Sequence, residues 1–157
     1  MNAYRAKPLT YPWPPFLYVV AMLGAAALGR LAPISVAHSQ GWIPWLAGAA
    51  LILVAVSLDI WAMKTLIERH TAVLPHRRSS HLVTCGPFRL TRNPIYLGYT
   101  LAMVGFGLIT LNPWFFIMAS VAVALTTAFA VRREELHLLS RFGFEFERYC
   151  RATSRWI

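Results

Sequence analysis

Two short polar motifs, set in a mostly apolar chain, hold residue types that can bind a charged ligand. In the first, Arg89 and Arg92 stand just before Asn93 and Pro94. Asn93 can cap a helix and Pro94 fits the first helical position, so a helix is predicted to begin there. A helix N-terminus carries unpaired N–H groups and a partial positive charge, which the arginines reinforce. The motif predicts an anion-binding corner, although anchoring of the helix to lipid phosphates explains the arginines equally well.

The second motif is Arg132-Arg133-Glu134-Glu135. A pair of carboxylates where a helix leaves the membrane gains nothing from anionic lipid headgroups. Two interpretations are open: the glutamates pair with Arg132, Arg133 or arginines of the first motif, or they hold an ammonium group of a ligand. The residues by themselves favour ion pairing.

Four apolar helices are predicted to position these motifs at a membrane surface. The chain is 57% hydrophobic and only 13% charged, which a soluble domain of 157 residues cannot accommodate because a globular core needs a polar shell. Eighteen helical residues reach roughly 27 Å, close to the thickness of a hydrocarbon layer. The apolar runs cover residues 15–30, 44–63, 94–111 and 113–131. Residues 1–157 are therefore expected to form a single all-α integral membrane domain.

The basic residues predict which side of the membrane the motifs face. Fourteen of the fifteen would lie on one face, which the positive-inside rule assigns to the cytoplasm together with both termini. The net charge of +9 is thus a topology signal and an affinity for anionic membrane lipids, with no nucleic-acid partner expected. The compact form favours a bacterial inner membrane. The fourteen are Arg5, Lys7, Lys64, Arg69, Arg77, Arg78, Arg89, Arg92, Arg132, Arg133, Arg141, Arg148, Arg151 and Arg155.

Two cytoplasmic segments, residues 64–93 and 132–157, carry most of the polar side chains, and function is expected on them. In the second segment apolar residues recur at spacings of three and four, which predicts an amphipathic helix on the membrane or against the bundle, interrupted near Gly143. These residues are Leu136, Leu139, Phe142, Phe146 and Tyr149.

Other residues that can carry chemistry give weaker signals. Asp59 lies inside the second apolar run, roughly 7 Å from its middle, by the helical rise. An intramembrane carboxylate indicates function, but solvation near the interface or pairing with a loop arginine also accounts for it. No metal site is predicted, because the two cysteines and the nearby histidines lack metal-ligand spacing. These are Cys85, Cys150, His70, His76 and His81.

Both motifs belong to longer patterns. The first reads His81-Leu82-Val83-Thr84-Cys85-Gly86-Pro87-Phe88-Arg89, then Thr91-Arg92-Asn93-Pro94-Ile95-Tyr96-Leu97-Gly98. The second reads Glu134-Glu135-Leu136, then Leu139, Phe142-Gly143, Tyr149 and Arg155-Trp156, and upstream stand Trp61-Ala62, Thr65-Leu66, Thr71 and Pro75. Over roughly residues 59 to 157 these patterns resemble the isoprenylcysteine carboxyl methyltransferase (ICMT) family. Phospholipid N-methyltransferases share the same general plan.

The resemblance implies a methyltransferase that uses S-adenosyl-L-methionine (SAM), held on the cytoplasmic side under a lid of the two polar segments. It implies that the cofactor is bound by Arg92, Asn93, Tyr96, Glu134 and Glu135 and by backbone at His81, Leu82, Val83 and Gly86. For a carboxylate acceptor, Arg132 or Arg133 would orient the nucleophile, with Glu135 steering that arginine. For an amine acceptor, Glu135 or Asp59 would matter more because a proton must leave.

The implied acceptor is a lipophilic molecule that enters sideways from the bilayer: a prenylcysteine-like acid, a phospholipid amine or another lipophilic compound. The family's larger eukaryotic carboxyl methyltransferases carry extra spans that are absent here, and the nearest approach to the phospholipid enzymes' Gly-x-Gly is Gly48-Ala49-Ala50. Two other functions stay open. A membrane reductase of related plan would bind a nicotinamide nucleotide, and a non-catalytic scaffold would bind no nucleotide-like ligand.

Overall fold

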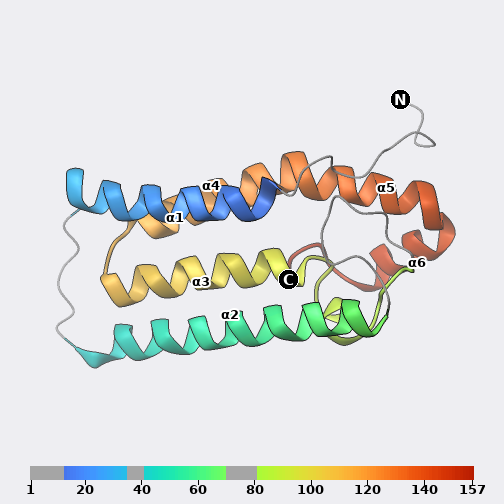
Figure 1. Cartoon of the computed structure of the whole chain (residues 1–157), viewed down its shortest axis with the longest axis horizontal. Helices are drawn as coiled ribbons and strands as arrows, with labels where there is room; N and C mark the ends of the chain where they lie inside the picture. The colour runs from blue at the N-terminus through green and yellow to red at the C-terminus, as the bar shows by residue number, and fades with distance from the viewer. Residues whose placement is uncertain (1–12, 35–40, 70–80) are drawn as a thin grey trace.

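The computed structural model of the chain describes residues 13–34, 41–69 and 81–157 (Figure 1). Its elements are α1 (Trp13–Leu31), α2 (Trp42–Glu68), the 3-10 turn η2 (Gly86–Arg89), α3 (Pro94–Thr110), α4 (Trp114–Thr126), the π-helical turn η3 (Thr127–Val131), α5 (Arg132–Phe142) and α6 (Phe144–Ala152). The predicted all-α architecture is confirmed. Outside the described residues lie Arg5, Lys7, His70, Thr71, Pro75, His76, Arg77 and Arg78.

Three of the described helices are long and apolar enough to cross a membrane: α1, α2 and one continuous helix, Trp114–Phe142, that comprises α4, η3 and α5. The fourth predicted span is α3, a shorter apolar helix of 17 residues. These lengths and compositions are those of an integral membrane protein, as predicted. The assignment of the polar end to the cytoplasm stays a prediction.

The helices extend beyond the apolar runs that predicted them. α2 continues to Glu68, where the Lys64 Nζ and Glu68 Oε1 atoms lie 3.9 Å apart on exposed side chains one helical turn from each other. The last span passes through η3 into α5 without a break. Apolar composition marks where lipid contacts a helix, whereas backbone hydrogen bonds decide where the helix ends.

The four long helices form two packed pairs that share a central contact (Figure 1). α2 lies along α3, α1 lies along α4, and α3 and α4 join the pairs. The first pair approaches closely at two glycines: a Cβ atom on Gly48 would stand 2.5 Å from the carbonyl oxygen of Gly105. The core between α1, α3 and α4 is formed by Tyr18, Ala21, Met103, Ala119 and Ala122.

The outer faces of the bundle stay apolar. Within the most apolar 18-residue stretch of α1, and likewise of α2, only 17% of the residues are buried inside the protein. Leu53 on α2 is 69% exposed and Phe129 in η3 is 54% exposed. Such surfaces suit contact with acyl chains and leave few apolar side chains to form an internal core.

The polar elements gather at one end of the bundle, at the right of Figure 1. There α2 ends, α3 begins and the last span leads into α5. The chain turns at Gly143, whose φ of +50° suits glycine, and α6 folds back toward the start of α3. The predicted interruption of the C-terminal helix near Gly143 is confirmed.

Candidate functional site

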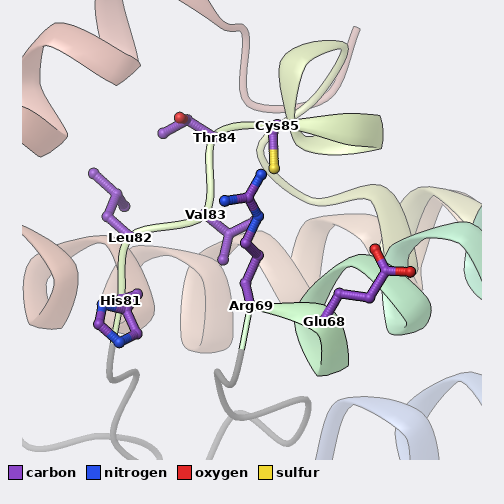
Figure 2. Close-up of a pocket in the computed structure, with 7 residues that line it drawn as sticks. All are labelled: Glu68, Arg69, His81, Leu82, Val83, Thr84 and Cys85. Atoms are coloured by element: carbon purple, nitrogen blue, oxygen red, sulfur yellow. The ribbon is translucent and has the colours of Figure 1, made fainter.

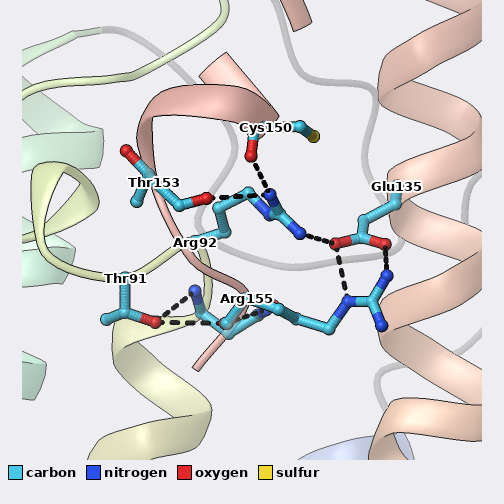
Figure 3. Close-up of polar contacts among 7 residues, drawn as sticks. Thr91, Arg92, Glu135, Cys150, Thr153 and Arg155 are labelled. Carbon is cyan, nitrogen blue, oxygen red and sulfur yellow. Dashed lines mark hydrogen bonds and ion pairs between the residues drawn. The ribbon is translucent and has the colours of Figure 1, made fainter. Parts of the chain in front are cut away.

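The two polar motifs meet in an ion cluster at the start of α3 (Figure 3). Arg92, from the loop before α3, places its Nη2 atom 3.0 Å from Oε1 of Glu135 on α5. Arg155, beyond α6, donates from Nε to Oε1 over 3.0 Å and from Nη2 to Oε2 over 2.6 Å. We call Arg92, Glu135 and Arg155 the Glu135 cluster. Its formal charge is +1, since two guanidinium groups surround one carboxylate.

Arg92 also binds the backbone of the C-terminal segment. Its Nη1 atom donates to the carbonyl oxygens of Cys150 and Thr153 over 3.0 and 2.8 Å. Its backbone N–H donates to the carbonyl of Ser154 over 3.0 Å. The Cys150 carbonyl lies in the last turn of α6 and those of Thr153 and Ser154 lie just beyond it, where a helix leaves acceptors without partners. Arg92 therefore fixes the end of the chain while it binds Glu135.

Asn93 occupies the N-cap position of α3 but makes no side-chain cap hydrogen bond. The helix begins at Pro94 as predicted, whereas the expected capping by Asn93 is wrong. Its Nδ2 atom instead donates to the carbonyl of Arg155 over 2.9 Å. The Thr91 hydroxyl donates to the same carbonyl over 3.1 Å. The extended C-terminal backbone competes for these side chains, which a capping rule based on local sequence does not consider.

Tyr149 ties α6 to the η2 turn. Its hydroxyl donates a 2.6 Å hydrogen bond to the carbonyl oxygen of Phe88. Burial raises the pKa of Tyr149 above its ordinary value, so the phenol keeps the proton that it donates. The predicted amphipathic helix thus packs against the loop before α3 through Tyr149, and Phe146, whose ring lies beside that of Tyr149, is also buried.

The two adjacent glutamates have different partners. Glu134 accepts a hydrogen bond from the hydroxyl of Tyr96, in the first turn of α3. Glu135 faces Arg92 and Arg155. Neighbouring residues on a helix point about 100° apart, so one acidic pair can serve two directions at once. The structure thereby brings together four of the residues predicted to hold a cofactor: Arg92, Tyr96, Glu134 and Glu135.

Arg132 and Arg133 are exposed at the start of α5. The expected steering of either arginine by Glu135 is corrected, because the Glu135 carboxylate is bound by Arg92 and Arg155 instead. Arg132 and Arg133 stay exposed, whereas Arg92 reaches Glu135 from a largely buried position and Arg155 from the segment after α6.

A pocket of about 540 Å³ opens beside the end of α2 (Figure 2). Three of its lining residues, His81, Leu82 and Val83, are those predicted to contact a cofactor through their backbone. The others are Glu68, Arg69, Thr84 and Cys85. Sequence reasoning assigned no role at this pocket to Glu68 or Arg69, and their position at the polar end of an apolar run is the signal that indicates them.

Gly86 has a packing role. It has a φ of +61°, which disfavours other residues, and a Cβ atom there would stand 2.9 Å from the Thr65 hydroxyl oxygen on α2. Gly86 is not among the residues that line the pocket. Its close packing holds η2 against α2 and so positions the preceding segment, residues 81–85. The predicted contact of the Gly86 backbone with a cofactor stays a prediction.

Comparison with known protein families identifies the family to which these motifs belong. Residues 43–145, about two thirds of the chain, match the model of the phospholipid methyltransferase family. The chain belongs to the phospholipid methyltransferase family. The match covers α2, α3, α4 and α5, and with them Arg92, Tyr96 and both glutamates. The chain is therefore a membrane domain of this family, and the predicted resemblance is confirmed.

Two curated relatives carry metal-resistance names. The nickel-cobalt-cadmium resistance protein NccN of Alcaligenes xylosoxydans xylosoxydans is 32% identical over 117 residues, which are 74% of this chain and 53% of that protein. The cobalt-zinc-cadmium resistance protein CzcN of Cupriavidus metallidurans is 35% identical over 77 residues, 49% of this chain and 35% of that protein. The chain spans about half the length of the first relative and about a third of the second.

No solved structure gives a significant match to the chain. Within residues 13–34, 41–69 and 81–157, no group of three His, Cys, Asp or Glu side chains is arranged to hold a metal ion. Both cysteines are free thiols, and burial raises the pKa of Cys150, which keeps this thiol protonated at neutral pH.

Proposed function

We propose that the protein transfers a methyl group from SAM to a lipophilic acceptor that enters from the bilayer. The observation that carries the proposal is the convergence of the family's motifs at the membrane-adjacent end of α3. There Tyr96 binds Glu134, and Arg92 binds Glu135, within one turn of the helix start. Residues 38 and 43 positions apart in the chain thus build one polar site on an apolar bundle.

The donors and acceptors at this site suit the charged groups of SAM. The Nε atom of Arg92 is buried and has no hydrogen-bond partner among the described residues, and the Glu135 cluster carries a net positive charge, which favours a carboxylate. Glu134 offers a carboxylate to an ammonium group. The pocket of about 540 Å³ beside the end of α2, which is lined by other residues, has the size of a typical small-molecule site.

The chemistry asks little of the protein beyond positioning. SAM supplies an activated methyl group with a good leaving group attached. The residues of this chain then have to orient the acceptor in line and keep water away from it. The cluster of Arg92, Glu135 and Arg155 would fix the bound SAM, against which the acceptor has to align. The apolar faces of α2 and α3 next to it provide the dry surroundings.

The lipophilic body of the acceptor follows from the exposed apolar faces of the bundle, which a bilayer-borne molecule can approach directly. The family plan implies either a prenylcysteine-like carboxylate or a phospholipid amine as the methylated group. A carboxylate acceptor would need a cation to orient it. Of the arginines that could supply this cation, Arg132 and Arg133 are exposed and Arg92 is already bound to Glu135.

Calorimetric titration of the purified protein with S-adenosylhomocysteine, the product form of the cofactor, tests the proposal. We expect saturable binding by the wild-type protein. Glu134→Gln should weaken it about tenfold or more, because a charge-assisted hydrogen bond is lost. Glu145→Gln is the matched control, since Glu145 is exposed on α6; its affinity should equal that of the wild type.

Absence of binding to folded wild-type protein would overturn the proposal. Binding of equal affinity in Glu134→Gln and Glu145→Gln would instead remove Glu134 from the cofactor site. Protection of the wild type against heat by NADPH and not by S-adenosylhomocysteine would favour a membrane reductase.

A further inference from the structure

Tyr18 is a buried phenol in an otherwise apolar stretch of α1. Between Trp13 and Arg30 the helix carries no other side chain with a strong hydrogen-bonding group. Tyr18 is only 4% exposed, and its hydroxyl oxygen lies 2.9 Å from that of Thr100 on α3. A bilayer core holds no water to satisfy such a group, so the protein has to supply its partner. α1 lies outside the residues that match the family model.

The hydrogen bond between these hydroxyls has a fixed direction, from Tyr18 to Thr100. The Thr100 hydroxyl has a single proton, which it donates to the backbone carbonyl oxygen of Tyr96 over 2.8 Å. The Tyr18 hydroxyl is therefore the donor in its contact with Thr100. A hydroxyl that accepts one hydrogen bond becomes a better donor in the next, so the two bonds strengthen each other. Tyr18 thus acts on the backbone of Tyr96, in the first turn of α3.

A second connection joins the aromatic rings. The Tyr18 ring meets that of Tyr99 edge to face, with centroids 5.4 Å apart and an interplanar angle of 61°. The Tyr99 ring in turn lies beside that of Tyr96, with centroids 6.5 Å apart. Aromatic pairs prefer particular angles, so each ring restricts the orientation of the next. This row of rings leads from α1 to the Tyr96 hydroxyl, which donates to Glu134 on α5.

We propose that Tyr18 is a positioning residue of the candidate cofactor site: it holds Tyr96 in the orientation from which the phenol donates to Glu134. The inference rests on the proposed methyltransferase function, in which Glu134 meets the ammonium group of SAM, and it adds α1 to that site. Tyr96 is buried, so its protein neighbours determine where its hydroxyl points. A binding group has to be held within about 0.5 Å of its working position, which requires packed supporting side chains.

The first experiment observes Tyr96 directly and needs no ligand. 3-Fluorotyrosine is placed at position 96 by amber suppression, and the fluorine NMR spectrum is recorded in phosphatidylcholine nanodiscs. We expect one resonance with Tyr18 present and a shifted or divided resonance in Tyr18→Phe, because the hydroxyl that supports Tyr96 is lost. An unchanged resonance would overturn the inference.

Phe115→Leu is the matched control for this experiment. Phe115 is 5% exposed and so about as buried as Tyr18, but it lies at the start of α4. Its neighbour Trp114 donates to the carbonyl of Ala32, just beyond the far end of α1 from Tyr18. The resonance from position 96 should therefore stay where it is in the wild type. An equal change in Phe115→Leu and Tyr18→Phe would overturn a specific role for Tyr18.

The second experiment measures binding in a double-mutant cycle. Affinity for S-adenosylhomocysteine is titrated calorimetrically in Tyr18→Phe, Tyr96→Phe and the double variant. We expect Tyr18→Phe to weaken binding about fivefold, within the range for a residue that acts through its neighbours. Tyr96→Phe removes the phenol through which Tyr18 acts, so in that background Tyr18→Phe should change affinity by less than about twofold. A merely structural role would give equal factors in both backgrounds, and that result would overturn the inference.

Two substitutions at Thr100 test the same link from its other side. Thr100→Val removes the hydroxyl and keeps the shape of the side chain, so it should weaken binding by about the same factor as Tyr18→Phe. Thr100→Ser keeps the hydroxyl and should bind like the wild type. These two variants decide the question if Tyr18→Phe does not fold. Equal affinities in Thr100→Val and Thr100→Ser would overturn transmission through this hydroxyl.

The outcomes separate this inference from the proposed function. If the folded wild type does not bind S-adenosylhomocysteine, the proposed function fails, and the fluorine spectra still decide whether Tyr18 positions Tyr96. If the wild type and Tyr18→Phe bind it equally well, the methyltransferase function stands and the role of Tyr18 fails.

Discussion

Glu135 and Asp59 are carboxylates of the same chain in opposite situations. Both oxygens of Glu135 are bound, by two guanidinium groups at 2.6 to 3.0 Å, at the polar end of the bundle. The Oδ1 atom of Asp59 is buried within the α2–α3 interface, with no hydrogen-bond partner among the described residues. A carboxylate whose acceptors are all satisfied stabilises its surroundings, whereas a buried one left unsatisfied lowers stability. Stability measurements can therefore distinguish the two regions.

The largest expected effect is from Glu135→Ala. It leaves Arg92 and Arg155 side by side without a counter-charge, so the free energy of unfolding should fall by about 3 kcal/mol, as for other broken, partly buried ion pairs. Unfolding in mixed micelles with increasing sodium dodecyl sulfate measures it. Glu145→Ala, on the exposed face of α6, should change the value by less than about 0.5 kcal/mol. Equal effects of the two substitutions would show that the Glu135 cluster contributes nothing.

A smaller loss is expected from Gly98→Ala. The new Cβ atom would overlap the Asp59 carboxylate, which should cost about 2 kcal/mol of unfolding free energy. In the background of Asp59→Ala the same substitution should cost at least about 1 kcal/mol less, because the obstructing group is gone. The double-mutant cycle tests the contact directly. Strictly additive effects would contradict the packing of Asp59 against Gly98.

The smallest effect has the opposite sign. Asp59→Asn should raise the free energy of unfolding by about 1 kcal/mol, because a neutral amide loses less hydration on burial than a carboxylate. The same titration measures it, with Ser57→Ala as the control on that helix. A loss of stability as large as that of Glu135→Ala would mean that Asp59 has a strong partner in the folded protein, and the contrast between the two carboxylates would fail.

Much of the fold could be predicted because it depends on local composition. Apolar runs located the spans, Asn93-Pro94 located the start of α3, and Gly143 located the turn before α6. Even the polar end could be anticipated, since the glutamates were expected to pair with arginines of either motif, and Arg92 is one of them. These features need only neighbouring residues and the thickness of a bilayer.

The remaining contacts depend on how distant segments pack. Arg92 binds the carbonyls of Cys150 and Thr153, and backbone carbonyls are present at every position, so the sequence does not distinguish them. The bond from Asn93 to the Arg155 carbonyl spans 62 positions. The depth of Asp59 followed from the helical rise, but its contact with Gly98 depends on the rotation of α2 against α3, which apolar composition on all sides does not determine.

The π-helical turn η3 sets the rotational phase of everything that follows it. A π turn accommodates one residue more than an α turn, and each residue of an α-helix advances about 100° around the axis. Removing one residue between Thr126 and Arg132 would carry Glu134 and Glu135 about 100° around the helix, away from Tyr96 and Arg92. Chimeras with other family members must therefore preserve the residue count of this turn before any similarity of side chains matters.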